Sequence, residues 1–372
     1  MSTEGVRIIQ KTDRISRRQL HNMAFVALLS PVIRQIPRTI TLTTGRTAWL
    51  AGILSFLPCL LVAYFLKAFL RSKAPDEGLG EVFLHALGPV FGRLAILLYT
   101  LWMLFYAGFV LRTGADRFIS TVYPNSRPWI FVSAMLILAL LAGLGRLKVL
   151  ARTAELVRPL LIAVFVVVFS FALPDVRKEN LLPVSILDTV PLLISVLPVV
   201  NTLSLVLYTA FLDNRTEPGR IIADAMENLI LLLLVVTFLC MTTIGIFGAE
   251  LTVRMNHPFF VMIRNIEIFN LFERVEAVVI ALWVVTDYVL VSLLLQICSG
   301  NLCLIVKGPG AERTKLSVWI CAAAALIVSI FIAPTSFRLE QMTRAFIPIS
   351  SSILLFVGLP VIFLIGRLRK KI

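Results

Sequence analysis

Ten long apolar stretches without charged side chains limit the fold of this chain more than any other feature. A helix needs about 20 apolar residues to cross the hydrocarbon core of a bilayer, and most of these stretches reach about 18. They cover residues 19–33, 47–66, 94–111, 128–145, 159–174, 189–212, 228–249, 288–306, 316–337 and 345–366. The eighth begins earlier, near Val275, and is interrupted by Asp287.

The composition also favours a membrane protein. Apolar residues make up 59% of the 372 positions and charged residues 15%, whereas soluble domains are about half apolar and a quarter charged. This composition excludes a soluble enzyme, a nucleic-acid-binding domain and a disordered scaffold. We expect an all-α integral membrane protein, with one domain of about ten transmembrane helices over residues 19–366. A cytoplasmic tail, 1–18, precedes it, and a basic cytoplasmic tail, 367–372, follows it.

The basic residues predict the orientation. Ten spans place both ends of the chain on one side of the membrane. If that side is the cytoplasm, the tails and inner loops carry 22 of the 35 Lys and Arg residues, the outer segments carry 12, and Arg34 lies inside a span. Such an excess in short cytoplasmic loops is usual for membrane proteins. We therefore attribute the net charge of +14 to topology rather than to a nucleic-acid partner.

One outer segment, residues 250–274, is too charged to span the membrane, and its apolar residues recur at helical spacing after Pro258. We expect a helix or loop lying in the outer interface, either packed on the bundle or acting as a lid. Catalytic and nucleotide-binding motifs are missing from the sequence, and its five cysteines and three histidines lack metal-ligand spacing. We expect no enzyme, no metal and no cofactor.

Prolines and polar residues interrupt two of the spans. Span 1 contains Arg34 between Pro31 and Pro37, and span 6 contains Pro198 followed by Asn201. Many secondary transporters consist of two five-helix inverted repeats whose first helices are broken at the substrate site. The pattern therefore predicts a 5+5 inverted repeat with broken helices 1 and 6, as in LeuT; the alternative is that these prolines are ordinary kinks.

Asp287 is the isolated charge of span 8. It can act as the counter-ion of Arg34, as a proton or cation relay, or as the recognition group for a substrate amine, and a structural ion pair with some arginine is equally open. We hypothesise that it pairs with Arg34, so that Asp287→Asn alters affinity rather than folding. In span 3, Arg112 and Asp116 stand four residues apart, and we expect a local ion pair between them.

Four stretches together resemble a known family. They are Gly45–Leu50, Ala151–Glu155, Asn180–Val184 and, most specifically, His257–Val285. In order and spacing they are similar to the B subunits of endospore germinant receptors, the spore germination permease family of the amino acid–polyamine–organocation superfamily. The resemblance covers nearly the whole chain.

This resemblance implies a location in the spore inner membrane and two partners, an A subunit with large hydrophilic domains and a lipoprotein C subunit. It also implies a pocket for a small nutrient germinant, commonly an amino acid. By position, the pocket residues are Ser30, Pro31, Val32, Ile33, Arg34, Tyr106, Val200, Asn201, Thr202, Ser204, Thr286, Asp287 and Tyr288. The chain departs from the family where relatives have glycine in span 1 and Gly-x-Glu in span 6, so Arg34 is expected to bind a ligand carboxylate instead.

Three functions therefore compete. The first is a ligand-sensing receptor subunit that has kept a transporter fold. The second is an active permease that moves an amino acid or organic cation with H⁺ or Na⁺ and uses Asp287 for coupling. The third is a membrane anchor for the A subunit, in which changes of the pocket have no effect on germination.

Overall fold

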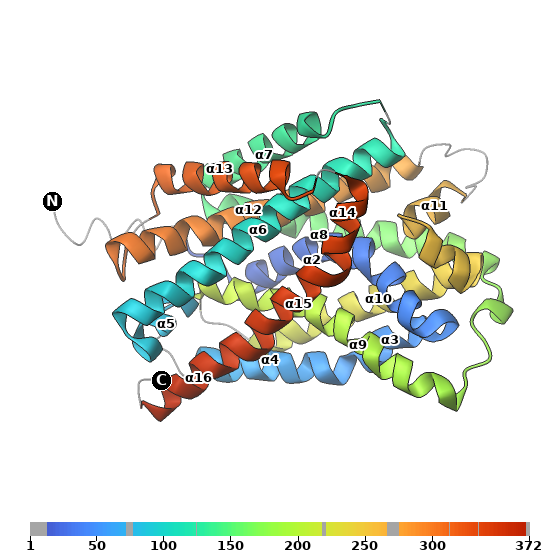
Figure 1. Cartoon of the computed structure of the whole chain (residues 1–372), viewed down its shortest axis with the longest axis horizontal. Coiled ribbons are helices and arrows are strands. Elements are labelled where there is room, and N and C mark those ends of the chain that lie inside the picture. The colour runs from blue at the N-terminus through green and yellow to red at the C-terminus, as the bar shows by residue number, and fades with distance from the viewer. Residues whose placement is uncertain are drawn as a thin grey trace.

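The computed structural model describes residues 13–71, 77–123, 125–217, 221–265, 275–311, 313–333 and 335–369. Within these ranges the regular structure is helical, and the β contacts amount to an isolated parallel bridge between Ile15 and Thr216. The helices form one bundle (Figure 1).

The described helices form ten membrane-crossing segments. Spans 1 to 5 are α2 (Arg17–Thr44), α3 with α4 (Leu50–Leu54 and Phe56–Arg71), α6 (Pro89–Thr121), α7 (Pro128–Leu144) and α8 (Leu147–Ala172). Spans 6 to 10 are α9 (Thr189–Ser204) with the 3-10 helix η5 (Leu205–Arg215), α10 (Ile221–Arg254), α12 (Val275–Lys307), α13 (Lys315–Phe331) and α14 to α16 (Ser336–Gln341, Ile347–Ser352 and Leu359–Leu368). Short helices α5 (Leu79–Leu87) and α11 (Pro258–Arg264) lie between spans.

Length and hydropathy support this assignment. Seven stretches of the described chain are long and apolar enough to cross a membrane, and the first of them, Arg17–Phe69, contains both span 1 and span 2. The chain changes direction between these two spans at Gly45, whose φ of 64° lies in the left-handed region that glycine tolerates. α7 and α13 are shorter apolar helices. The predicted all-α membrane protein with about ten transmembrane helices is confirmed.

α2 lies in the middle of the bundle (Figure 1) and packs against α8, α9, α10 and α12. Most of its residues are buried, including polar ones that an outer helix would expose to lipid. The outer faces of α4, α7, α8 and α13 instead carry exposed large apolar side chains, such as Leu61, Leu141, Leu156 and Ile327. A hydrocarbon solvent suits this distribution, because water would make so large an apolar surface costly.

Only part of the predicted helix breaking is found. α2 is continuous through Pro31 and Pro37, although each proline removes one backbone donor. Span 6 is irregular, but α9 also continues through Pro198, and the change occurs after Ser204, where the chain continues as the 3-10 helix Leu205–Arg215. A membrane helix can keep a proline when neighbouring groups satisfy the freed carbonyls. The predicted break at Pro31–Arg34 is therefore wrong.

Half of the predicted outer segment is a helix packed on the bundle. α10 contains a non-helical Gly248 with φ 75°, so residues 249–254 leave the direction of span 7. α11 follows, at the opposite end of the bundle from α5 and α16 (Figure 1), and buries Phe259 and Phe260. The Phe260 ring lies 5.4 Å from that of Trp283 in α12. Residues 266–274 lie outside the described ranges.

Polar contacts hold the N-terminal segment against the end of span 6. Ile15 donates its N–H to the carbonyl of Arg215 and accepts from the N–H of Glu217. Arg17 forms a buried ion pair with Asp213, the two side chains being 8% and 5% exposed. These contacts bring together the beginnings and ends of helices that are far apart in the sequence.

Asp213→Asn is expected to lower the free energy of unfolding by about 3–5 kcal/mol, because it leaves the buried Arg17 guanidinium without its counter-charge. Thermal unfolding of the full chain in detergent would measure the loss. Glu155→Gln is the matched control, since Glu155 is exposed and accepts an exposed hydrogen bond from Gln19. Equal stability of the two variants would show that the Arg17–Asp213 pair contributes little.

Candidate functional site

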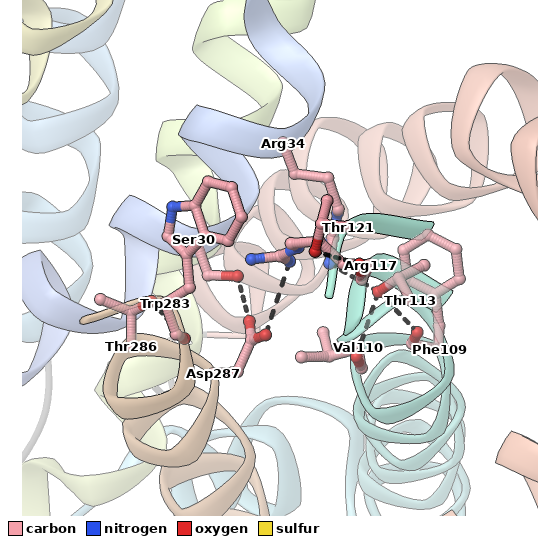
Figure 2. A network of polar contacts seen from close by, with 10 residues as sticks. All are labelled: Ser30, Arg34, Phe109, Val110, Thr113, Arg117, Thr121, Trp283, Thr286 and Asp287. Carbon is pink, nitrogen blue, oxygen red and sulfur yellow. Dashed lines mark hydrogen bonds and ion pairs between the residues drawn. The ribbon is translucent and has the colours of Figure 1, made fainter. Parts of the chain in front are cut away.

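Three helices bring charged side chains together inside the bundle. α2 contributes Ser30 and Arg34, α6 contributes Thr113 and Arg117, and α12 contributes Asp287 (Figure 2). We call these five residues the Asp287 cluster. Asp287 and Arg117 are 3% and 4% exposed, so both charges are removed from solvent and from lipid. Charges at such depth are costly, which makes the cluster a functional candidate.

Both oxygens of Asp287 have partners. The Ser30 hydroxyl donates a hydrogen bond to Oδ1. Nη2 of Arg117 lies 3.5 Å from Oδ2 and forms an ion pair. α6 approaches closely at Gly114, where a Cβ atom would lie 3.2 Å from Oδ2. The Arg117 guanidinium also lies 4.9 Å from the centre of the Trp283 ring, which adds a cation–π contact.

Arg34 binds α6 rather than Asp287. Its Nη1 donates to Thr113 Oγ1 at 2.7 Å, and its guanidinium lies 5.1 Å from the centre of the Phe109 ring. The predicted Arg34–Asp287 pair is therefore wrong for this structure. Ser30 and Arg34 are one turn apart on α2, and it is Ser30 that lies beside Asp287, while Arg117 supplies the counter-charge.

The cluster keeps unused hydrogen-bond donors. Arg34 Nε and Nη2, Arg117 Nε and Tyr106 Oη are buried and lack a hydrogen-bond partner within the described part of the chain. Tyr106 is close enough to interact electrostatically with both Arg34 and Asp287. An unsatisfied buried donor costs about 1–3 kcal/mol, and more when it is charged. A bound group that carries acceptor oxygens would remove this cost.

Other predicted residues lie near or away from the cluster. Thr286 is next to Asp287 and donates to the carbonyl of Trp283 at 2.9 Å. Pro31, Val32 and Ile33 are buried in the same turn of α2 as Arg34. Tyr288 is partly buried and packs against the apolar core.

The span 6 residues belong to two other surroundings. Asn201 accepts from Ser351 Oγ at 2.9 Å and Ser352 Oγ at 3.1 Å, so it links span 6 to α15 rather than to the cluster. Thr202 donates to the carbonyl of Pro198, and Val200 is buried apolar packing. Ser204 lines a separate cavity of about 70 Å³ beside the Arg17–Asp213 pair. None of these four is printed in a contact with the Asp287 cluster, so their grouping with Arg34 in one pocket is wrong for this structure.

Sequence reasoning missed Thr113, Arg117, Phe109 and Trp283. The uncharged run of span 3 ends at residue 111, so Arg117 was counted with the outer segments, whereas α6 continues to Thr121. Helical spacing was the available signal, since positions 106, 109, 113 and 117 recur at three or four residues and lie on one face of a helix.

The predicted local pair of Arg112 and Asp116 is also wrong. Within the described residues, Asp116 accepts from Ser336 Oγ at 2.6 Å and forms no ion pair with Arg112. Asp116 therefore joins α6 to the start of α14, the first helical segment of span 10.

Comparison with known sequences points to one group of proteins. The sequence profile of a family described as "Spore germination protein" matches residues 14–337. The chain is 24% identical to the putative spore germination protein YfkT of Bacillus subtilis (strain 168) over 286 residues, 76% of each chain. It is 26% identical to spore germination protein KB of the same organism over 296 residues, again 76% of each chain.

Two solved transporters share the fold. One is Mhp1, a nucleobase-cation-symport-1 family transporter in a closed conformation with bromovinylhydantoin bound (TM-score 0.58, 12% identity, 92% of this chain and 76% of Mhp1). The other is a Na⁺-coupled sialic acid symporter in a substrate-bound outward-open state (TM-score 0.57, 11% identity, 92% of this chain and 79% of the symporter). At this identity the likeness concerns the fold alone, and it confirms the predicted LeuT-like architecture.

Proposed function

The chain belongs to the spore germination protein family, and we propose that it is the B subunit of a germinant receptor. In this role it binds a small nutrient germinant within the membrane and signals to partner subunits to trigger germination. It resides in the spore inner membrane with both termini in the cytoplasm. Its partners are an A subunit with large hydrophilic domains and a lipoprotein C subunit. The name of the relative spore germination protein KB supports the subunit assignment.

One observation carries the ligand-binding role: the Asp287 cluster retains buried donors that no described protein group satisfies. We propose that a carboxylate of the germinant binds the free N–H groups of Arg34, with Arg117 and Tyr106 beside it. Guanidinium groups suit this task because their planar fork matches the two oxygens of a carboxylate. Amino acids are the first ligands to test, as the family resemblance suggests.

The fold places the cluster where a binding event can be transmitted. Ser30 and Arg34, Thr113 and Arg117, and Asp287 belong to three spans, and Arg117 stacks on Trp283, which contacts Phe260 of α11. A ligand that draws Arg34 or Arg117 toward itself would change contacts between spans 1, 3 and 8 and reach the outer helix α11. Partner subunits can sense such a shift without any transport.

A permease is the second candidate, favoured by the fold shared with two symporters. In that case Asp287 would couple the substrate to H⁺ or Na⁺. Proteoliposomes containing only this chain separate the two candidates, because a permease takes up substrate alone, whereas a receptor subunit binds its ligand without flux.

Arg34→Lys tests the proposed role of the cluster. Lysine keeps the positive charge but loses the planar fork, so the germinant concentration for half-maximal germination should rise by about tenfold, equivalent to about 1.4 kcal/mol. Germination dose-response of spores that carry the variant at equal protein level is the measurement. Arg152→Lys is the control, because Arg152 is exposed on α8. A dose-response equal to that of the control would remove Arg34 from the site.

A further inference from the structure

The charges of the Asp287 cluster do not balance. Arg34 and Arg117 carry two positive charges, and Asp287 carries one negative charge, so the cluster has a net charge of +1. Within the described residues, Asp287 is the acidic side chain paired with these arginines. A net charge that is enclosed by protein inside a membrane is costly, and a bound anion neutralises it.

The free groups of the cluster are donors. Arg34 Nε and Nη2, Arg117 Nε and Tyr106 Oη can each donate a hydrogen bond, and the guanidiniums cannot accept one. The acceptor of the cluster, Asp287, already binds Ser30 through Oδ1 and Arg117 through Oδ2. The site therefore favours a ligand that offers acceptors and carries no ammonium group.

The surroundings of the cluster are also positive on the side of α11. His257, just before α11, has a pKa lowered to about 3 by burial and by the neighbouring guanidiniums of Arg117, Arg34 and Arg38. His257 thus stays neutral at physiological pH and adds no proton to the cluster. The three arginines that depress its pKa make this region attractive to anions.

An apolar cavity lies one helical turn from the cluster. Its volume is about 20 Å³, which is space for one or two methyl-sized groups. Ala27 of α2, three residues before Ser30, and Leu290 of α12, three residues after Asp287, both line it, so it continues the cluster along the same two helices. Tyr106 lines the same cavity and connects it with the free donors.

We infer that the ligand of the Asp287 cluster is a small monocarboxylate of net charge −1, with a short apolar chain and no ammonium group. Its carboxylate binds the free donors of Arg34, Arg117 and Tyr106, and its apolar chain enters the cavity beside Ala27 and Leu290. Asp287 acts as the internal counter-ion that holds Arg117 rather than as the receptor for an amine. This ligand class rests on the proposed function, which needs only a nutrient that carries a carboxylate.

The charge of the complex distinguishes this ligand from an amino acid. A monocarboxylate brings the site to a net charge of zero. A zwitterion leaves the charge at +1 and adds an ammonium group beside two guanidiniums, while the acceptor atoms of Asp287 already have partners. Propionate and alanine are a suitable pair of probes, because they differ only in the ammonium group.

Calorimetric titration of the purified full chain in detergent would measure the preference. Propionate should bind at least tenfold more tightly than alanine, and both ethylamine and chloride should bind more weakly than propionate by at least the same factor. Arg34→Gln, which removes a cation that has no ion-pair partner among the described residues, should weaken propionate binding at least tenfold. Arg152→Gln on the exposed face of α8 is the control.

Several results would overturn the inference. Alanine binding as tightly as propionate would show that the ammonium group is accepted, and chloride binding as tightly would show that the apolar chain is not recognised. Absence of propionate binding up to about 100 mM by a folded chain would also contradict it. Germination of spores tests the proposed function separately: a normal response of Arg34→Lys spores would refute the receptor role of the cluster, whatever the purified chain binds.

Discussion

Asp287→Asn is expected to destabilise the protein by about 3–5 kcal/mol, because it leaves both Arg117 and Arg34 buried without an anion. From the sequence alone, the same change was expected to alter affinity rather than folding. The structure changes this expectation, since Asp287 is the ion-pair partner of Arg117 and accepts the Ser30 hydrogen bond. Thermal unfolding of the full chain in detergent, without added carboxylate, measures the effect.

A double variant separates charge from packing. Arg117→Gln combined with Asp287→Asn removes both members of the ion pair and should recover a large part of the stability lost in Asp287→Asn, because no buried charge of the pair is left alone. If the double variant is as unstable as the sum of the two single variants, the two side chains do not interact energetically. The assignment of Arg117 as the partner of Asp287 would then be wrong.

Arg34→Met is expected to raise the germinant concentration needed for a response by at least about 100-fold, or to abolish the response. Removing one partner of a buried, hydrogen-bonded charge pair costs about 2–5 kcal/mol in affinity. The chain should still fold, because Arg34 has one hydrogen bond, to Thr113, and methionine can retain the apolar contact with Phe109. Spore germination at equal protein level measures the response.

Thr113→Val is the matched comparison for Arg34→Met. It removes the hydrogen bond to Arg34 but keeps the guanidinium, so the shift in germinant concentration should be smaller than for Arg34→Met. An unchanged dose-response in Arg34→Met would assign Arg34 a structural role, and a shift in Thr113→Val equal to that in Arg34→Met would place the ligand contact elsewhere.

Regions that departed from regular helix were harder to locate from sequence. Proline positions in spans 1 and 6 predicted breaks at Pro31–Arg34 and Pro198–Thr202, yet both helices pass through these prolines. Proline removes a single donor, and whether the helix opens depends on the groups that surround the freed carbonyl. The 3-10 segment Leu205–Arg215 has no proline at its start, so no local signal marked it.

The sequence by itself determined the number of spans, the membrane location and the two intramembrane charges, Arg34 and Asp287. These conclusions depend on local hydropathy, and each window of about 20 residues contains the information needed. Only the tertiary structure decided the partners. Ser30 and Asp287 are 257 residues apart, and their contact depends on how α2, α6 and α12 are rotated and offset against one another. A shift of one turn would pair Arg34 with Asp287, and only the packing of the three helices excludes it.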